Sequence, residues 1–357
     1  MEISGEGLRA RKLVTPLNPG APWDLDLPAR GIVGLSGPSG AGKSTLLQAL
    51  AGLRGCSGEI HWSGICWQSG NRGLAAHRRD ACVGFQDSRL FAGTSVAENL
   101  ALVHRHSRRP LPPAERQRLL AGFGATDLLH KTVESLSGGE AQRVALLRQL
   151  FSNPALQLCD EALSAVDRPL RLRLLPQLWD FWQRHPALVV WASHSVEEIQ
   201  LLADSCLWME CGRLRGPLPT PQVAARLAGG KMPEYSRIDA LVTEQRAGLL
   251  RLSLEGHSLY ADRVANNYRV AQAVHFLLAA GDISLSVVHP GLSSALNCLP
   301  VRLESLETVD DGRIRLLLST GNARFCADIS GFSCERLALQ AGESYFAQFK
   351  ACAPLGL

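Results

Sequence analysis

The stretch Gly37-Pro38-Ser39-Gly40-Ala41-Gly42-Lys43-Ser44-Thr45 matches the phosphate-binding pattern G-x-x-x-x-G-K-[ST]. An apolar run at 31–35 precedes it and is typical of a buried strand, and residues 46–50 after it indicate a helix. Such a loop turns backbone N–H groups towards one anion, and the helix N-terminus adds its positive end. The pattern therefore predicts a nucleotide site in which Lys43 reaches the β- and γ-phosphates and Ser44 binds Mg²⁺.

Length and composition limit the classes of protein to consider. A chain of 357 residues, 46% hydrophobic and 20% charged, is typical of a soluble globular protein of two or three domains. The net charge of +4 is too small to predict nucleic-acid binding. The 10 cysteines form no C-x-x-C pair, so we expect neither a zinc site nor disulfides. No apolar run approaches the roughly 18 residues of a membrane span, so any membrane role requires a partner.

A second glycine-containing helix start follows the first. Gln86 ends a β-like stretch, and the segment after it reads as helical. Ser137 then precedes Gly138 and Gly139, and Glu140 would complete a capping box with Ser137. The two glycines expose backbone N–H groups that suit an anion. Two separate phosphate-facing helix ends indicate a nucleotide held between two surfaces.

Two later apolar runs end in polar residues. The run 156–159 leads into Asp160 and Glu161, where one carboxylate can hold Mg²⁺ and the next can accept a proton from water. Asp167 follows shortly afterwards. The run 188–193 ends at His194, at the carboxyl end of an expected strand, where open parallel sheets bind their ligands. A lone histidine there is more often structural, but this one lies downstream of three other phosphate-site elements.

Taken in order over residues 1 to about 215, these motifs resemble those of the ATP-binding-cassette ATPase family. The resemblance implies an α/β P-loop NTPase domain with a helical subdomain at about 87–136 and the cofactors ATP and Mg²⁺. It assigns three roles to the motif residues, with Gln86 and Ser44 each taking two: catalysis to Glu161, His194 and Gln86, Mg²⁺ binding to Ser44, Gln86 and Asp160, and nucleotide contacts to residues 37–45, Ser137, Gly138, Gly139 and Asp167.

The resemblance also implies a head-to-tail homodimer, in which Ser137 and Gly139 of one subunit cap the ATP on the loop of the other. Three features depart from the family pattern: Ala162 replaces the usual proline, Gln157 and Cys159 interrupt the apolar run before Asp160, and no clear aromatic residue stands where many relatives stack the adenine. Trp23 shares a strand face with Leu25 and Leu27, and we expect it in the core rather than on an adenine.

The C-terminal third differs in pattern. Gly and Pro residues at 216–221 predict a linker over 216–235, and the short strands with Gly and Asp turns after it predict an all-β, OB-like domain over 236–357. Stretches at 282–286, 292–300 and 329–350 resemble the oxyanion-binding (TOBE/Mop) barrel of molybdate-importer ATPases. That resemblance implies Ser294 and Asn297 as oxyanion ligands, with Ser333 and Lys350 as weaker candidates. The alternative is that Ser294 and Asn297 are turn residues of a barrel that only dimerises.

Together the two resemblances imply the ATP-hydrolysing subunit of a molybdate importer. It would lie peripherally on the cytoplasmic face of the inner (plasma) membrane and act with permease subunits and an external solute-binding protein, without nucleic acid. Three alternatives stay open: import of tungstate, sulfate or another solute; a soluble cassette ATPase that acts on DNA or ribosomes; and an anion sensor with a secondary ATPase. The soluble cassette ATPases usually carry two cassettes or long coiled coils, and this chain has one cassette and no heptad run.

Overall fold

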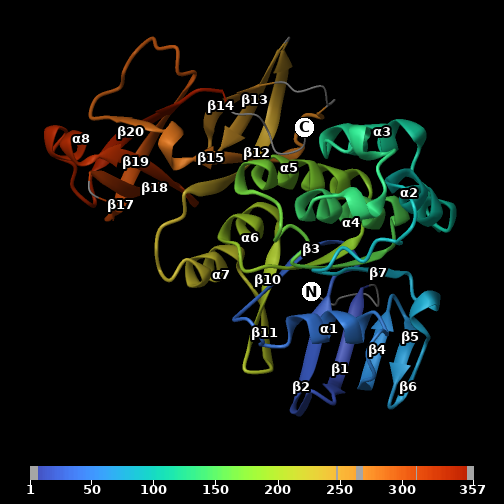
Figure 1. Ribbon diagram of the computed structural model, residues 1–357. Coiled ribbons are helices and arrows are strands. Elements are labelled where there is room, and N and C mark those ends of the chain that lie inside the picture. Colours follow the sequence, from blue (N-terminus) through green and yellow to red (C-terminus); the bar gives the residue numbers. More distant parts are fainter. Residues whose placement is uncertain (1–6, 247, 263–267, 311, 352–357) are drawn as a thin grey trace. The chain divides into compact units, whose positions relative to one another are not determined.

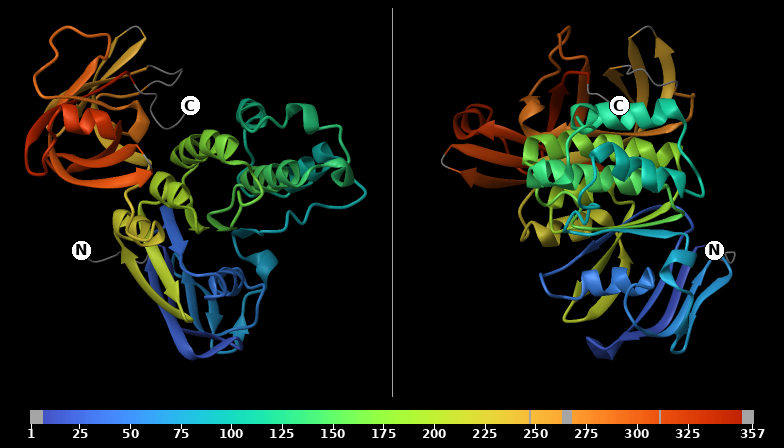
Figure 2. Two further views of the ribbon diagram at one scale, coloured as in Figure 1. Left: turned by 60° about the vertical axis from the view of Figure 1, so that its left-hand side comes forward. Right: turned by 45° about the vertical axis from the view of Figure 1, so that its right-hand side comes forward.

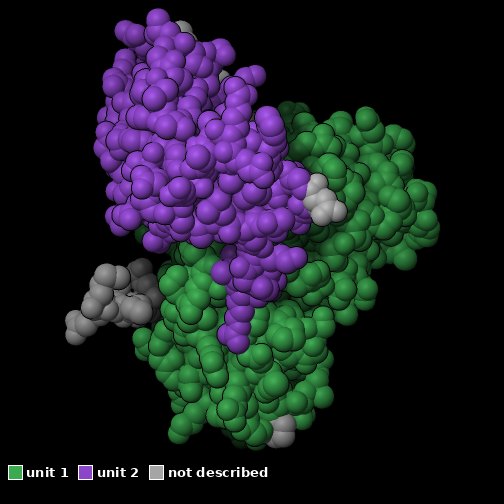
Figure 3. Space-filling view, turned by 90° about the vertical axis from the view of Figure 1, so that its left-hand side faces the viewer, with its two compact units in different colours: residues 1–223 green, residues 224–357 purple. Residues whose placement is uncertain are grey.

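The computed structural model describes residues 7–246, 248–262, 268–310 and 312–351. It divides the chain into two compact units, Met1–Val223 and Ala224–Leu357 (Figure 3). The outer ends of the two expected domains, residues 1–6 and 352–357, lie outside the described residues.

The central sheet of unit 1 carries the ends of the predicted phosphate-site strands. Its strand order is β11-β10-β3-β9-β8-β7, parallel except at the β10–β11 pair. All positions of β8 and β9 are buried, as expected for parallel strands covered on both faces. The strands are β3 (Gly31–Ser36), β7 (Ala81–Gly84), β8 (Leu156–Asp160), β9 (Leu188–Ala192), β10 (Ser205–Glu210) and β11 (Arg213–Leu218).

An antiparallel sheet with the order β2-β1-β4-β5-β6 forms the second layer of unit 1. One hydrophobic core joins it to helix α1 (Lys43–Leu50) and to the central sheet. Trp23 belongs to this core at 1% exposure, and its Nε1 donates to the Gly212 carbonyl over 2.7 Å. The strands are β1 (Leu8–Thr15), β2 (Asn18–Leu27), β4 (Ser57–Trp62), β5 (Ile65–Ser69) and β6 (Arg72–Gly73).

Helices cover the other side of the central sheet. In Figures 1 and 2, α2 and α3 (teal) and α4 and α5 (green) lie across that sheet from the antiparallel sheet (blue). The chain is not helical between Asp87 and Thr94, because α2 starts only at the capping box of Ser95 and Glu98. The helices are α2 (Val96–Arg105), α3 (Pro113–Gly122), α4 (Gly138–Ser152), α5 (Arg168–Arg184) and α6 (Val196–Leu202), with 3₁₀ turns at Ala76–Arg78, Thr126–Leu128 and Val133–Ser135.

The segment expected as a linker, 216–235, is largely folded. It contains the end of β11 and helix α7 (Thr220–Leu227), and β12 begins at Tyr235. Pro221 lies in the first turn of α7, where its missing N–H costs nothing, and Thr220 Oγ1 donates to the Ala203 carbonyl over 3.0 Å. The proline signals here therefore start a helix.

Unit 2 consists of two antiparallel sheets that share one hydrophobic core. The first has the order β14-β13-β12-β15, and the second has the order β16-β20-β17-β18-β19. This all-β build agrees with the predicted fold class. The elements are β12 (Tyr235–Arg246), β13 (Leu249–Leu254), β14 (His257–Asp262), β15 (Ala273–Ala279), a 3₁₀ turn (Ala280–Asp282), β16 (Ser284–Ser286), β17 (Asn297–Asp310), β18 (Arg313–Thr320), β19 (Ala323–Ser330), α8 (Gly331–Arg336) and β20 (Ser344–Phe349).

Candidate nucleotide site

The predicted phosphate loop joins β3 to α1 and depends on glycine at its ends. Gly37 has a φ of 146°, and a Cβ on it would come within 1.9 Å of the Met209 carbonyl oxygen. Gly42, the N-cap of α1, has a φ of 109°. Both positions therefore require glycine. Between them, Gly40 has open space where a Cβ would stand, so the outer side of the loop is accessible.

Lys43 lies beneath the loop. Its side chain is 6% exposed, and its Nζ donates to the carbonyls of Gly37 over 2.8 Å and Pro38 over 3.0 Å. Burial lowers the pKa of Lys43, while the charges of Glu161 and Asp160 raise it. A buried ammonium group beside an open loop suits a polyphosphate, which would supply oxygens in place of the two carbonyls.

Asp160, the last residue of β8, is 7% exposed, and its carboxylate accepts a hydrogen bond from the Ser44 hydroxyl. Burial raises the pKa of Asp160 and so does the Glu161 charge, whereas Ser44 and Lys43 lower it. A hydroxyl and a carboxylate in contact form the hard oxygen set that Mg²⁺ binds, so the two residues fit this ion.

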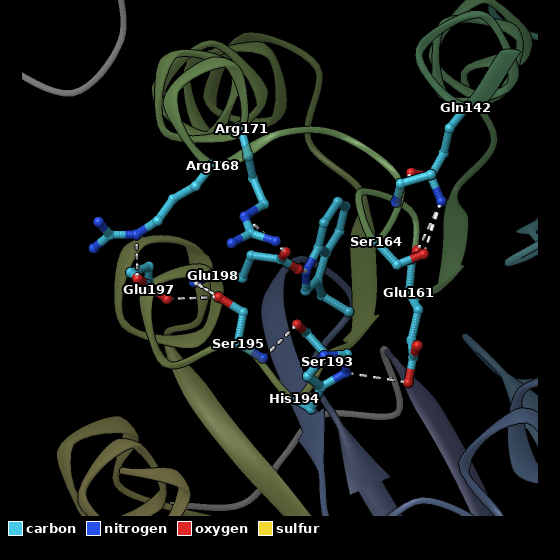
Figure 4. A network of polar contacts seen from close by, with 12 residues as sticks. Gln142, Glu161, Ser164, Arg168, Arg171, Ser193, His194, Ser195, Glu197 and Glu198 are labelled. Atoms are coloured by element: carbon cyan, nitrogen blue, oxygen red, sulfur yellow. Dashed lines mark hydrogen bonds and ion pairs between the residues drawn. The ribbon is translucent and has the colours of Figure 1, made fainter. Parts of the chain in front are cut away.

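Glu161 is fixed in an unusual conformation next to Asp160. Its φ of 50° lies in the left-handed region, which is uncommon for a residue with a side chain and is often found at functional sites. Its N–H donates to the Ala192 carbonyl at the end of β9 over 3.0 Å. Its carboxylate lies 3.4 Å from Nδ1 of His194, just beyond β9 (Figure 4). The structure thus brings together two predicted catalytic residues from neighbouring strands.

Polar contacts among the residues on both sides of His194 in the chain hold the segment between β9 and α6 (Figure 4). The Ser195 N–H donates to Ser193 Oγ over 3.0 Å, and Trp191 Nε1 donates to Glu198 Oε2 over 2.9 Å. Glu198 is 3% exposed, and burial raises its pKa although Trp191 and Ser193 donate to it. Arg171 of α5 lies 3.7 Å from Glu198, so the network connects α5 and α6.

The predicted capping box at the start of α4 is present. Ser137 Oγ accepts from the Glu140 N–H over 3.3 Å, and Glu140 Oε2 accepts from the Ser137 N–H over 2.8 Å. Hydrogen bonds from the Ser137 backbone and from Lys131 lower the pKa of Glu140 to about 2. Ser137 and Gly138 are exposed, and Gly139 is half-buried. The helix start is therefore accessible to an anion.

The other predicted residues of unit 1 lie at exposed positions. Asp167 is the N-cap of α5, with Oδ1 accepting from the Leu170 N–H over 3.0 Å. Gln86 lies two residues beyond the end of β7. The contact group itself is formed by Lys43, Ser44, Asp160, Glu161 and His194, at the carboxyl ends of β3, β8 and β9. This is the edge at which open parallel sheets bind ligands.

No motif in the sequence indicated Gln142 on α4, which is 3% exposed. Its Nε2 donates to the Glu161 carbonyl over 3.2 Å and to Ser164 Oγ over 3.0 Å. Its Oε1 accepts from the Ala165 N–H over 2.6 Å. The available signal was its helical spacing: residues 142, 146, 149 and 150 share one face and are all buried.

The structure gives Asn297 in unit 2 a different role from the predicted oxyanion ligand. Its side chain is fully buried, and both Nδ2 hydrogens are used, on the carbonyls of Tyr260 (2.9 Å) and Lys350 (3.0 Å). Oδ1 accepts from the Tyr260 N–H over 2.6 Å. The amide therefore joins strands and has no donor left for an anion. Ser294 and Lys350 are exposed, and Ser333 is half-buried near the start of α8 with its N–H bonded to Ser330 Oγ.

In the part of the chain that the structure describes, no helix is long and apolar enough to cross a membrane.

The chain is similar to known proteins over nearly its whole length. The sequence model of the family described as ABC transporter matches residues 21–164. A curated protein from Pseudomonas aeruginosa, named molybdenum import ATP-binding protein ModC, is 34% identical over 98% of this chain and 99% of its own length. Proteins of the same name from Rhodopseudomonas palustris and Rhodobacter capsulatus are each 35% identical over 92% of this chain and over 90% and 93% of their own lengths.

Two solved structures share the fold. A dimeric ATP-binding cassette in a post-hydrolysis state, bound to ADP and Pi, has a TM-score of 0.51 at 20% identity and covers 60% of this chain and 98% of its own. The cbiO1 protein of Clostridium perfringens, part of the ABC transporter complex cbiONQ, has a TM-score of 0.50 at 23% identity and covers 61% of this chain and 90% of its own. Given the near full-length similarity to the ModC proteins, this chain belongs to the ABC transporter family, among the molybdenum import ATP-binding proteins.

Proposed function

We propose that this chain is the ATP-hydrolysing subunit of an importer whose cargo is molybdate. The observation that carries the ATPase part is the contact group at the ends of β3, β8 and β9, in which Lys43, the Ser44–Asp160 pair and the Glu161–His194 pair converge. The cargo is proposed because the curated relatives that match the chain over nearly its whole length are named for molybdenum import.

Each residue of the contact group has its own role in the proposed binding and hydrolysis of ATP. Residues 37–45 and the Lys43 ammonium group bind the phosphates of ATP. Ser44 and Asp160 hold Mg²⁺, with Gln86 as a further ligand, and this ion neutralises charge on the phosphates when bound. Glu161 accepts the proton of the attacking water, because its carboxylate lies beside Asp160 and contacts His194 at the ends of β8 and β9. His194 hydrogen-bonds the γ-phosphate and contacts the Glu161 carboxylate.

The complete site needs two copies of the chain. We propose a head-to-tail homodimer in which Ser137, Gly138 and Gly139 of one subunit cap the ATP bound by the other. The exposed start of α4, with its positive helix end, supports this arrangement. Asp167, exposed at the start of α5, would lie at the same subunit boundary.

The dimer would act peripherally, on the cytoplasmic face of the membrane. Its partners in this proposal are permease subunits and, through the assembled complex, an external solute-binding protein. Gln86 would connect the nucleotide site to the permease.

The substitution Glu161→Gln tests the ATPase. We expect turnover to fall by roughly 10²- to 10⁴-fold, because the attacking water loses its proton acceptor. ATP binding should persist, because Lys43 and the loop are unchanged. Steady-state hydrolysis and equilibrium binding of ATP measure the two effects separately, and near wild-type hydrolysis by the variant would remove Glu161 from the catalytic role.

Uptake experiments test the cargo. With its permease and solute-binding protein in vesicles, the wild-type chain should drive ATP-dependent uptake of molybdate, and the Glu161→Gln variant should not. Uptake of sulfate or tungstate but not of molybdate would agree with the proposed ATPase activity and contradict the proposal that molybdate is the cargo.

We also propose that unit 2 binds oxyanion through Ser294, Ser333 and Lys350, with Asn297 holding the strands beside them. Isothermal titration of the full chain with molybdate, tungstate and sulfate should give heat that is reduced in Ser294→Ala. A titration without heat at millimolar anion would leave unit 2 as a dimerisation domain.

A further inference from the structure

Glu161 is held at three separate points. Its N–H bonds to β9, its carboxylate contacts His194, and its carbonyl accepts from the Ser164 N–H over 3.1 Å and from Nε2 of Gln142. Only the last contact comes from α4, which begins with Ser137 to Gly139, the residues proposed to cap the partner's ATP, and which we call the signature helix. Because Glu161 adopts a left-handed φ of 50°, it depends on such contacts to keep its conformation.

The loop that follows Glu161 lies against the same helix. The Ala165 N–H donates to Oε1 of Gln142 over 2.6 Å. A Cβ added to Gly139 would lie 3.1 Å from the carbonyl oxygen of Ala165, so the helix start packs closely on this peptide. Gln142 also donates to Ser164 Oγ over 3.0 Å, as Figure 4 shows. One buried amide thus connects α4 to both ends of the segment 161–165.

We propose that Gln142 is a positioning residue for ATP hydrolysis. It fixes the Glu161 backbone and the segment 161–165 on the signature helix, so that the catalytic carboxylate is correctly placed only while α4 is docked. This inference rests on the proposed ATPase function and adds a residue that does not contact nucleotide. A signature helix that shifts when it caps the partner's ATP would, through Gln142, also shift the Glu161 of its own subunit.

The substitution Gln142→Met tests this role, since methionine keeps the length of the side chain and removes all three hydrogen bonds. We expect kcat to fall by about 10- to 100-fold, because a displacement of about 1 Å in a catalytic group costs up to about 100-fold. The Kd for ATP should stay within about twofold, since no phosphate contact is removed.

Gln149→Met is the matched control on the same helix. Gln149 is 2% exposed, and its Nε2 donates to Cys159 Sγ over 3.2 Å. Because this substitution removes one hydrogen bond rather than three, it should lower the melting temperature by no more than Gln142→Met does, while kcat stays within about twofold of wild type. The proposal is overturned if Gln142→Met retains wild-type kcat, or if both variants lose kcat equally.

A second readout needs no ATP. Amide hydrogen exchange of the full chain should be faster across 161–167 in Gln142→Met than in wild type or in Gln149→Met, because the Ala165 N–H loses its acceptor. Equal exchange in this segment would refute the positioning role. If the wild-type chain hydrolyses no ATP, the proposed function fails, and the exchange comparison still decides whether Gln142 holds the segment.

Discussion

The amide of Asn297 replaces backbone partners that the strands around it lack. Its oxygen accepts from the Tyr260 N–H, and its NH₂ group donates to the carbonyls of Tyr260 and Lys350. We predict that Asn297→Leu, which has a similar volume, destabilises the chain by several kcal/mol, because each buried polar group left without a partner costs about 1–3 kcal/mol. Urea unfolding of the full chain, followed by a probe in unit 2, measures the change.

Ser294→Ala provides the contrast three positions away. Ser294 is exposed, so its removal should change stability by less than about 0.5 kcal/mol. If Asn297→Leu instead unfolds like the wild-type chain and loses only anion binding, Asn297 is a ligand and the structural role is wrong.

Between elements, Glu115 connects α3 to the end of α5. Its carboxylate pairs with Arg184, and the other carboxylate oxygen lies 3.7 Å from His185 Nε2. Burial raises the pKa of Glu115, but its contacts with His185 and Arg184 outweigh burial and lower the pKa from 4.5 to about 2. A lowered folded-state pKa contributes stability above the unfolded value, and this is lost as the pH falls from 4.5 towards 2.

We therefore predict a pH-dependent difference between wild type and Glu115→Gln. Wild type should have the higher melting temperature at pH 6 to 7, and the difference should shrink below about pH 4.5, as Glu115 takes up its proton on unfolding. Melting curves of both proteins from pH 7 to 3.5 test this. A difference that stays constant with pH would mean that the ion pairs of Glu115 do not lower its pKa.

For the whole molecule, dimer formation should depend on the start of α4. Ser137→Arg places a bulky cation at the exposed N-cap where the partner's γ-phosphate would dock. We expect ATP to bind without being hydrolysed. In a Glu161→Gln background, the double variant should not form the ATP-stabilised dimer that Glu161→Gln alone forms. Light scattering with ATP and Mg²⁺ distinguishes these states, and a tight dimer of the double variant would refute the head-to-tail arrangement.

Several features were predictable from sequence because their physical cause is local. Gly37 and Gly42 take φ values that favour glycine, and the loop between a strand and a helix follows from the pattern around them. The capping box of Ser137 and Glu140 closes within four residues. The order of motifs along the chain was enough to predict the fold class and the family of the protein.

Only the tertiary structure decided which distant residues meet. Glu161 and His194 contact each other because β8 and β9 are neighbours in the sheet, and strand order does not follow from any local pattern. Gln142 and Asn297 could not be assigned from sequence, since an amide acts on whatever backbone the fold places beside it. The prolines at 217–221 belong to the predicted linker, which contains the boundary between the two units but also, as the sequence pattern did not predict, the end of β11 and helix α7. Whether a proline ends an element or begins one depends on the surrounding structure that satisfies the neighbouring backbone.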